Sequence, residues 1–386
     1  MKYLLLLFAL VPSYGISQQA DPDPPHYPGV LKYKNDSCEE KVVSSLFEWE
    51  LKREQIKDSL QALFGKLPPI PTIPPFKDDS EEFPLFNTSV KDSLVTTHYT
   101  RYNIQFTVAS GESVTAYLYI PKSRKPNEKL PAMLALHETD LAGKKSVDGE
   151  GSYLRSRANL AYGKELAERG YVVIAPDYPG FGDQVNYDFK NDRYESGIMK
   201  GIFNHIRCVD FLQSRKEVDP ERIGVIGHSL GGHSAMYAAV FDARMKVIVS
   251  SCGWTLNLYK DNYNEEMRKK YGSRLWGRAQ ERYAPLALTK YGLKAERFPY
   301  DFDDVIAALA PRYFFSNSPI HDANCNVEGV RKGIANASAV YRLFDAEKNI
   351  RVRYPVATHD FPTETREDAY RFIDYVLVHN PSVRKD

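Results

Sequence analysis

Residues 222–232, with the sequence R-I-G-V-I-G-H-S-L-G-G, constrain the fold more than any other stretch of the chain. A short apolar run ends in G-H-S-L-G at 227–231, and the helix-forming run A-M-Y-A-A-V follows at 235–240. This order predicts a strand, a sharp turn with a serine at its apex, and a helix. The glycines two residues before and after the serine allow the tight turn, because they carry no Cβ. We therefore predict that Ser229 is a nucleophile and that the N–H of Leu230 helps to bind an oxyanion.

From residue 130 onward, apolar runs alternate with amphipathic segments of crossover length. We expect strands at 130–136, 171–175, 222–226, 246–250, 313–316 and 350–354. We expect helices at 154–169, 198–214, 229–241, 327–344 and 364–378. Apolar strands joined by helices predict an α/β fold with a mostly parallel sheet and helices on both faces. Catalytic groups on such a sheet lie at the carboxyl ends of the strands.

The region before residue 130 follows two other patterns. Residues 94–120 alternate apolar and polar side chains, which predicts an antiparallel meander. Residues 38–64 repeat apolar side chains at three- and four-residue steps, which predicts a helix, and a Pro-rich run follows at 67–75. We expect residues 18–90 to form an N-terminal helical and Pro-rich arm that packs on a catalytic domain at 91–386 or forms part of a substrate wall.

Residues 252–300 interrupt the alternation of strands and helices. This stretch is rich in tryptophan, tyrosine and charged residues, and we expect it as an insertion after the sixth strand. Because it directly follows a strand, it would lie over the active-site edge as a lid or a specificity wall. The alternative is a set of peripheral helices whose aromatic side chains pack on the sheet.

Charge and hydropathy limit where the protein acts and what it binds. The formal net charge is +1 over 386 residues, so there is no basic surface for nucleic acid. Residues 1–17 combine Lys2, a short apolar run and small residues, which is typical of a secretory signal peptide. No later segment is apolar for long enough to cross a bilayer. We expect a secreted or periplasmic protein with no membrane span.

The chain has four cysteines, Cys38, Cys208, Cys252 and Cys325. An even number in an exported protein permits disulfides. Cys252 and Cys325 both follow strands near the active-site edge, so we favour that pair, with four free thiols as the alternative. The spacings match no zinc pattern, and we expect neither a metal nor an organic cofactor.

A serine nucleophile needs a base within hydrogen-bond reach, and the base needs an acid that fixes its tautomer. On a sheet of this kind the chain order is serine, acid, histidine. His359 follows the last expected strand, where the base belongs, and Asp322 follows the strand before it. His233 lies one turn into the helix after Ser229 and points away, and Asp360 adjoins the base too closely to reach its Nδ1. We therefore predict a triad of Ser229, Asp322 and His359.

The second oxyanion donor should come from the loop after the first parallel strand. The backbone N–H of Thr139 is our choice, with Glu138 as the alternative. Candidate substrate contacts are His137, Glu138, Trp254 and Tyr178. For His137 the favoured role is to brace the loop by hydrogen bonding.

From about residue 130 to the end, the sequence resembles the exported α/β-hydrolases related to dienelactone hydrolase and to acetyl xylan esterases. The matching stretches are H-E-T at 137–139 with G-K at 143–144, E-L-A-E-R-G-Y at 165–171, A-P-D-Y-P at 175–179, G-H-S-L-G-G at 227–232, V-S-S-C-G-W at 249–254, A-P-R at 310–312, D-A-N at 322–324 and H-D-F-P at 359–362. The resemblance implies an α/β-hydrolase fold and the same triad. This chain departs from it at Cys325, where a phenylalanine is expected.

These observations favour a serine esterase that removes acetyl or methyl esters from plant or algal polysaccharides through an acyl-enzyme. A serine peptidase of the prolyl-oligopeptidase type is the first alternative, although the segment before residue 130 is too short for the propeller of such enzymes. The second alternative is a non-catalytic, carbohydrate-associated protein on a hydrolase scaffold. A serine, an aspartate and a histidine in the expected order argue against it.

Overall fold

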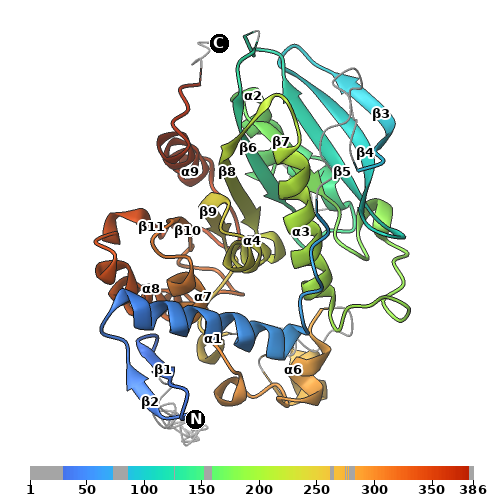
Figure 1. The fold of residues 1–386 in the computed structure, drawn as a ribbon. Helices are drawn as coiled ribbons and strands as arrows, with labels where there is room; N and C mark the ends of the chain where they lie inside the picture. Colours follow the sequence, from blue (N-terminus) through green and yellow to red (C-terminus); the bar gives the residue numbers. More distant parts are fainter. Residues whose placement is uncertain are drawn as a thin grey trace, which may run out of the picture.

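The computed structural model describes residues 29–72, 86–125, 127–151, 159–260, 265–273, 275, 277 and 283–381. The expected signal peptide lies outside these residues. The centre of the molecule is a nine-stranded sheet with the order β11-β10-β9-β8-β6-β7-β5-β4-β3 (Figure 1). Its strands are β3 (Ser89–Val95), β4 (Tyr99–Ala109), β5 (Glu112–Pro121), β6 (Leu130–Leu136), β7 (Val172–Pro176), β8 (Val218–His228), β9 (Met245–Ser251), β10 (Tyr313–Asn317) and β11 (Ile350–Arg353).

The sheet has an antiparallel part and a parallel part. Strands β3, β4 and β5 form the expected meander, and β5 also pairs antiparallel with β7. Strands β6 to β11 are parallel to one another, which confirms the predicted mostly parallel sheet. The prediction that the meander begins at residue 94 is wrong. Its first strand, β3, runs over 89–95, so the sheet begins before residue 91, and the turn to β4 occupies 96–98.

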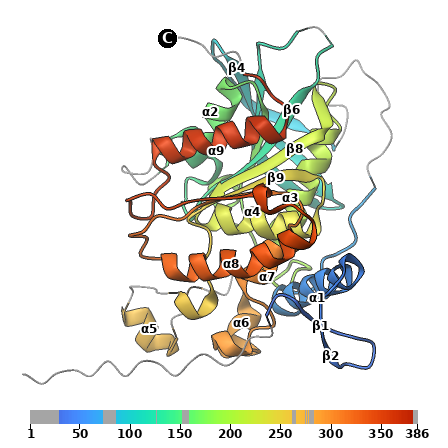
Figure 2. The same cartoon turned by 90° about the vertical axis from the view of Figure 1, so that its left-hand side faces the viewer.

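Helices cover both faces of the sheet (Figure 2). Helices α2 (Tyr162–Glu168) and α9 (Thr363–Val376) lie on one face, and α3 (Gly197–Gln213), α4 (Leu230–Phe241), α7 (Phe302–Ala308) and α8 (Val327–Leu343) lie on the other. Along β6, Met133 and Ala135 belong to the core under α2 and α9, whereas Leu134 and Leu136 belong to the core under α3 and α4. Because successive side chains of a strand point to opposite faces, a fully apolar strand such as β6 is buried on both sides.

The N-terminal arm contains a hairpin that the sequence pattern did not indicate. Strands β1 (Lys32–Lys34) and β2 (Glu40–Val42) pair antiparallel, and α1 begins only at Leu46 and ends at Phe64 (Figure 1). The expected helix over 38–64 is therefore too long at its start. Ser45 caps α1 by accepting a hydrogen bond from the N–H of Glu48, and Ser at this position stops the helix from extending backward. Helix α1 contacts α3, α6 (Pro285–Thr289) and α7.

The insertion follows β9, which is the seventh strand of the sheet in chain order rather than the sixth. Its described parts contain η4 (Asn257–Tyr259), α5 (Glu265–Tyr271), α6 and η6 (Ala295–Arg297). Further short 3₁₀ helices are η1 (Gly143–Asp148), η3 (Gly182–Gln184) and η7 (Glu347–Asn349).

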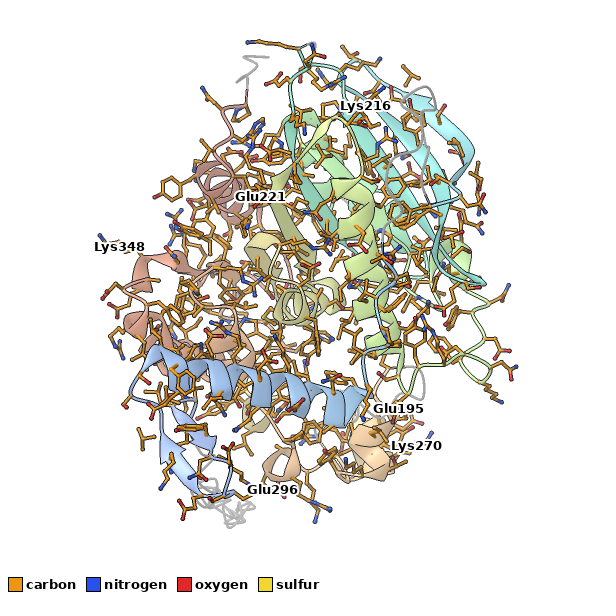
Figure 3. The ribbon with its side chains drawn as sticks, viewed as in Figure 1. Glu195, Lys216, Glu221, Lys270, Glu296 and Lys348 are labelled. Carbon is orange, nitrogen blue, oxygen red and sulfur yellow. The ribbon has the colours of Figure 1, made fainter. Side chains whose placement is uncertain are left out.

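Charges of both signs are spread over the surface. Six exposed charged side chains on separate parts of the fold are labelled in Figure 3: Glu195, Lys216, Glu221, Lys270, Glu296 and Lys348. This mixture agrees with the net charge of +1. Among the described helices, none is both long enough and apolar enough to cross a membrane.

Candidate active site

Ser229 stands at the turn between β8 and α4, at the carboxyl edge of the parallel strands. Its backbone has φ 53° and ψ −114°, a region that residues with a side chain rarely adopt. The two glycines make this turn possible: a Cβ on Gly227 would lie 2.3 Å from the carbonyl carbon of Gly231. A Cβ on Gly231 would lie 2.0 Å from the carbonyl oxygen of Leu136, at the end of β6. The motif is therefore required by close backbone packing.

Replacing Gly231 tests this packing. Gly231→Ala should lower the free energy of unfolding by about 1–3 kcal/mol, because the new methyl group must displace the end of β6. Gly201→Ala is the matched control, since a Cβ there would meet only His205, at 3.8 Å, inside α3. Urea denaturation of both variants measures the difference. Equal stability of the two variants would contradict the steric account.

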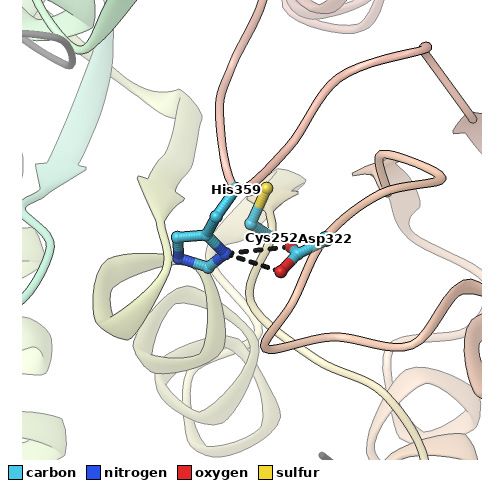
Figure 4. Close-up of side chains that lie close together, drawn as sticks. All are labelled: Cys252, Asp322 and His359. Atoms are coloured by element: carbon cyan, nitrogen blue, oxygen red, sulfur yellow. Dashed lines mark hydrogen bonds and ion pairs between the residues drawn. The ribbon is translucent and has the colours of Figure 1, made fainter. Parts of the chain in front are cut away.

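The three residues predicted as a triad lie together in the structure. His359 Nε2 is 2.9 Å from Ser229 Oγ, and His359 Nδ1 is 2.9 Å from both carboxylate oxygens of Asp322. Figure 4 shows the imidazole with Nδ1 directed at the Asp322 carboxylate and with Cys252 beside the pair. The loops after β8, β10 and β11 supply these three residues, so each side chain comes from the carboxyl end of its strand.

Asp322 is held as an anion. Burial raises its pKa, but the hydrogen bond and the charge of His359 outweigh that effect and leave the pKa below its ordinary value. Its Oδ1 also accepts hydrogen bonds from the backbone N–H groups of Asn324, at 2.7 Å, and Cys325, at 3.1 Å. An ionised carboxylate at Nδ1 keeps the proton on that nitrogen, so Nε2 is free to accept the proton of a serine hydroxyl.

A buried polar network, which the sequence did not reveal, supports the loop that carries His359. The Asn317 side-chain amide donates to the carbonyl of Asp360, at 2.8 Å, and to Ser251 Oγ, at 2.8 Å. Ser251 Oγ is 2.9 Å from His228 Nδ1. Burial, followed by the proximity of His359, holds the pKa of His228 well below its ordinary value, so this ring is neutral. Asn317 follows Ser316 at the polar end of β10, and nothing else in the sequence marks it.

Cys252 and Cys325 are free thiols in the structure, so the favoured disulfide is not formed. Cys325 Sγ instead donates to the carbonyl of Cys252, at 3.2 Å. The ligand-type atoms of Cys252, Asp322 and His359 lie within 4.8 Å of one another, and thiolate, carboxylate and imidazole are all zinc ligands. Two of the three, Asp322 and His359, already form a hydrogen bond with each other.

Hydrogen bonds and ion pairs hold the loop after β6 in place. His137 Nε2 accepts a hydrogen bond from the N–H of Tyr178, at 3.2 Å, so Nδ1 carries the proton and donates to the carbonyl of Glu138, at 2.6 Å. Deeper in the loop, Lys144 Nζ pairs with Asp177, at 2.6 Å, and with Asp183, at 2.9 Å. These bonds fix the backbone that presents Thr139 to the site.

Glu138 titrates in an unusual range, because burial raises its pKa to about 6 from an ordinary 4.5. Ser146 donates to one carboxylate oxygen, at 2.9 Å, and the other oxygen accepts no hydrogen bond from the residues that the structure describes. Protonated Glu138 contributes to the free energy of unfolding. This contribution is fully present below the pKa of the unfolded state, 4.5, and is lost as the pH rises through about 6. Glu138→Gln should remove this loss. Denaturation curves near pH 4 and pH 8 measure this. Between the two pH values, the free energy of unfolding of the variant should rise by about 2 kcal/mol relative to that of the wild type. A difference in free energy of unfolding between variant and wild type that is the same at both pH values would contradict this prediction.

A cavity of about 180 Å³ opens beside the serine. Its described lining residues are Thr139, Ile198, Ser229, Leu230, His233, Cys252, Gly253, Trp254, Thr255, Lys260, Leu275, Gly277, Tyr283, Ala284, Phe302, Asn324, Cys325 and His359. The insertion therefore forms one wall of the cavity. Of the four candidate substrate contacts, Trp254 lines it, whereas His137, Glu138 and Tyr178 do not. Thr139 and Leu230 both border it close to Ser229.

Comparison with known proteins places this geometry in a family. The model of the Alpha/beta hydrolase family matches residues 151–374. The chain is 29% identical over 267 residues to a protein of Bacillus subtilis (strain 168) that carries the name hydrolase YtaP, across 66% of this chain and 81% of that one. It is 26% identical over 180 residues to carbohydrate esterase MZ0003 from an unknown prokaryotic organism, across 44% of this chain and 40% of that one.

A solved structure shares the fold over nearly the whole chain. It is the glucuronoyl esterase from Solibacter usitatus, with a TM-score of 0.68 and 20% sequence identity, and it covers 92% of this chain and 99% of its own. The nine-stranded sheet, the turn at Ser229 and the family match over more than half of the sequence agree with the resemblance seen in the motifs. The chain belongs to the alpha/beta hydrolase family.

Proposed function

We propose that the protein is a serine esterase in which Ser229, His359 and Asp322 form the catalytic triad. The observation that carries the proposal is the position of His359, whose two ring nitrogens lie 2.9 Å from the Ser229 hydroxyl and from the Asp322 carboxylate. A neutral imidazole between a hydroxyl and a carboxylate is the arrangement that turns serine into a nucleophile at neutral pH.

The reaction follows from this geometry in two steps. His359 Nε2 takes the proton of Ser229 while Oγ attacks the ester carbonyl, and the backbone N–H groups of Leu230 and Thr139 stabilise the oxyanion. Leu230 begins α4, and the first N–H groups of a helix have no partner within it. His359 then protonates the leaving alcohol. Water, deprotonated by His359, releases the acyl group from Ser229 and restores the free enzyme.

A carbohydrate ester is the substrate class that we propose. The named carbohydrate esterase and the glucuronoyl esterase support it, and an exported protein would meet polysaccharides. The cavity wall offers Trp254, whose indole N–H donates to Ser316 Oγ at 3.0 Å and so fixes the ring for contact with a sugar face.

Three substrates distinguish the candidate functions. Purified protein should hydrolyse 4-nitrophenyl acetate and release acetate or methanol from esterified polysaccharides, and a fluorophosphonate should label Ser229. Turnover of an aminoacyl 4-nitroanilide without ester turnover would favour a peptidase. Absence of both labelling and turnover would favour a non-catalytic protein.

A further inference from the structure

Lys260 is the only side chain with a full charge among the described residues that line the cavity. It follows η4 directly, in the insertion. Its Nζ lies 4.0 Å from Cys325 Sγ, and the N–H of Cys325 donates to Asp322 Oδ1 at 3.1 Å. The ammonium group therefore stands beside the loop that carries the proposed catalytic acid.

Three more deeply enclosed lysines of the protein are matched by carboxylates. Lys144 pairs with Asp177, Lys200 pairs with Glu112, and Lys52 pairs with Asp304. Lys260 differs from them, because no carboxylate within the described parts of the chain forms an ion pair with it. A cation at the wall of a partly apolar cavity is stabilised by an opposite charge, and here that charge can come from a ligand.

A second polar side chain, Asn324, lines the cavity near the contact of Lys260 with Cys325. Asn324 directly precedes Cys325, which Lys260 contacts, and it lines the same cavity, so its side-chain amide offers a hydrogen-bond donor on that side. The cavity lining also includes apolar side chains: Ile198, Leu230, Leu275, Ala284 and Phe302. An ammonium and an amide on one wall can hold the two oxygens of a carboxylate, and the apolar walls exclude competing water.

The position of His359 decides which part of an ester meets Lys260 and Asn324. His359 Nε2 must protonate the oxygen of the leaving alcohol, so the alcohol portion lies on the side of His359 and Asp322. Lys260 lies on that same side through its contact with Cys325. The acyl carbonyl oxygen points the other way, toward Leu230 and Thr139.

We infer, on the basis of the proposed esterase function, that Lys260 and Asn324 bind a carboxylate on the alcohol portion of the substrate. The preferred substrates are then acyl esters of hydroxy acids, including O-acylated acidic sugars, rather than esters of neutral alcohols. Binding of the carboxylate acts on substrate affinity, so its main effect is on KM.

Two acetyl esters that differ only in charge test this inference. 4-Acetoxybenzoate carries a carboxylate on its alcohol portion, and 4-acetoxybenzamide is its neutral counterpart. Lys260→Met should lower kcat/KM for the carboxylate about 10- to 100-fold more than for the amide, which is the range expected for a charged hydrogen bond. Lys269→Met, an exposed lysine of the same insertion, is the matched control and should leave the ratio of the two substrates within about twofold.

The outcomes separate this inference from the proposed function. Equal losses on both substrates, or none, in Lys260→Met would overturn the carboxylate site while leaving the esterase intact. A wild-type protein that hydrolyses neither ester and resists the fluorophosphonate would overturn the esterase proposal instead. If Lys260→Met does not fold, the wild type alone decides: its preference for the carboxylate must be present at low salt and must shrink at about 0.5 M NaCl. No such preference would overturn the inference.

Discussion

Ser229→Ala is expected to lower kcat for ester hydrolysis by about 10⁶-fold. Alanine keeps the Cβ and removes only Oγ, the atom 2.9 Å from His359 Nε2. The acyl-enzyme then cannot form, and what is left comes from the oxyanion donors and from binding. The measurement is the steady-state hydrolysis of 4-nitrophenyl acetate with substrate above KM.

This loss must come from chemistry and not from unfolding. Alanine adopts the strained backbone at φ 53° no worse than serine, so the melting temperature of the variant should change little. Ser338→Ala, in α8, is the matched control and should retain full activity, because its hydroxyl donates to the carbonyl of Ile334 within the same helix. A Ser229→Ala protein that folds and keeps more than about a hundredth of the wild-type rate would exclude Ser229 as the nucleophile.

Asp322→Asn is expected to lower kcat by about 10⁴-fold. The asparagine amide donates where the carboxylate accepted, so the imidazole would take the tautomer with its proton on Nε2. That nitrogen could then no longer accept the proton of Ser229. The two backbone N–H groups that donate to Oδ1 can still bind the asparagine oxygen, so the loop should keep its shape.

Asp360→Asn is the control variant that distinguishes Asp322 from the neighbouring aspartate as the acid of the triad. Asp360 adjoins the proposed base in sequence, but its carboxylate accepts a hydrogen bond from Asn159, at 2.8 Å, while His359 Nδ1 is bonded to Asp322. Its replacement should change kcat only a few-fold. If Asp360→Asn lost activity to the same degree while Asp322→Asn did not, the assignment of the acid would be wrong.

Much of the fold was predictable from local patterns. The six parallel strands were identified within a few residues, because strands buried on both faces, such as β6 and β7, read as unbroken apolar runs. Four of the five expected helices also agree closely, but the helix expected at 154–169 begins only at Tyr162, as α2. The predictions were wrong where short polar elements were involved. The β1–β2 hairpin has alternating charges and little apolar content, and the start of α1 depends on a single capping serine, Ser45.

The residues of the proposed triad could be selected from the sequence for a topological reason. In a parallel sheet, residues that follow successive strands meet at one edge, so chain order restricts the choice of base and acid. The residues that hold the triad loops in place could not be selected from chain order. Asn317, Ser251 and His228 act through hydrogen bonds between neighbouring strands, and no spacing within one segment encodes a contact across 66 residues, as between Asn317 and Ser251.

The sequence by itself determined the parallel sheet, the strained turn at Ser229 and the strand ends that carry Asp322 and His359, because apolar runs and two glycines act locally. Only the tertiary structure decided which side chains face the cavity. It left His137, Glu138 and Tyr178 outside the cavity lining, kept Cys252 and Cys325 as thiols, and placed Lys260 beside the acid loop. Those outcomes depend on how separate loops pack against one another, and no local pattern contains that information.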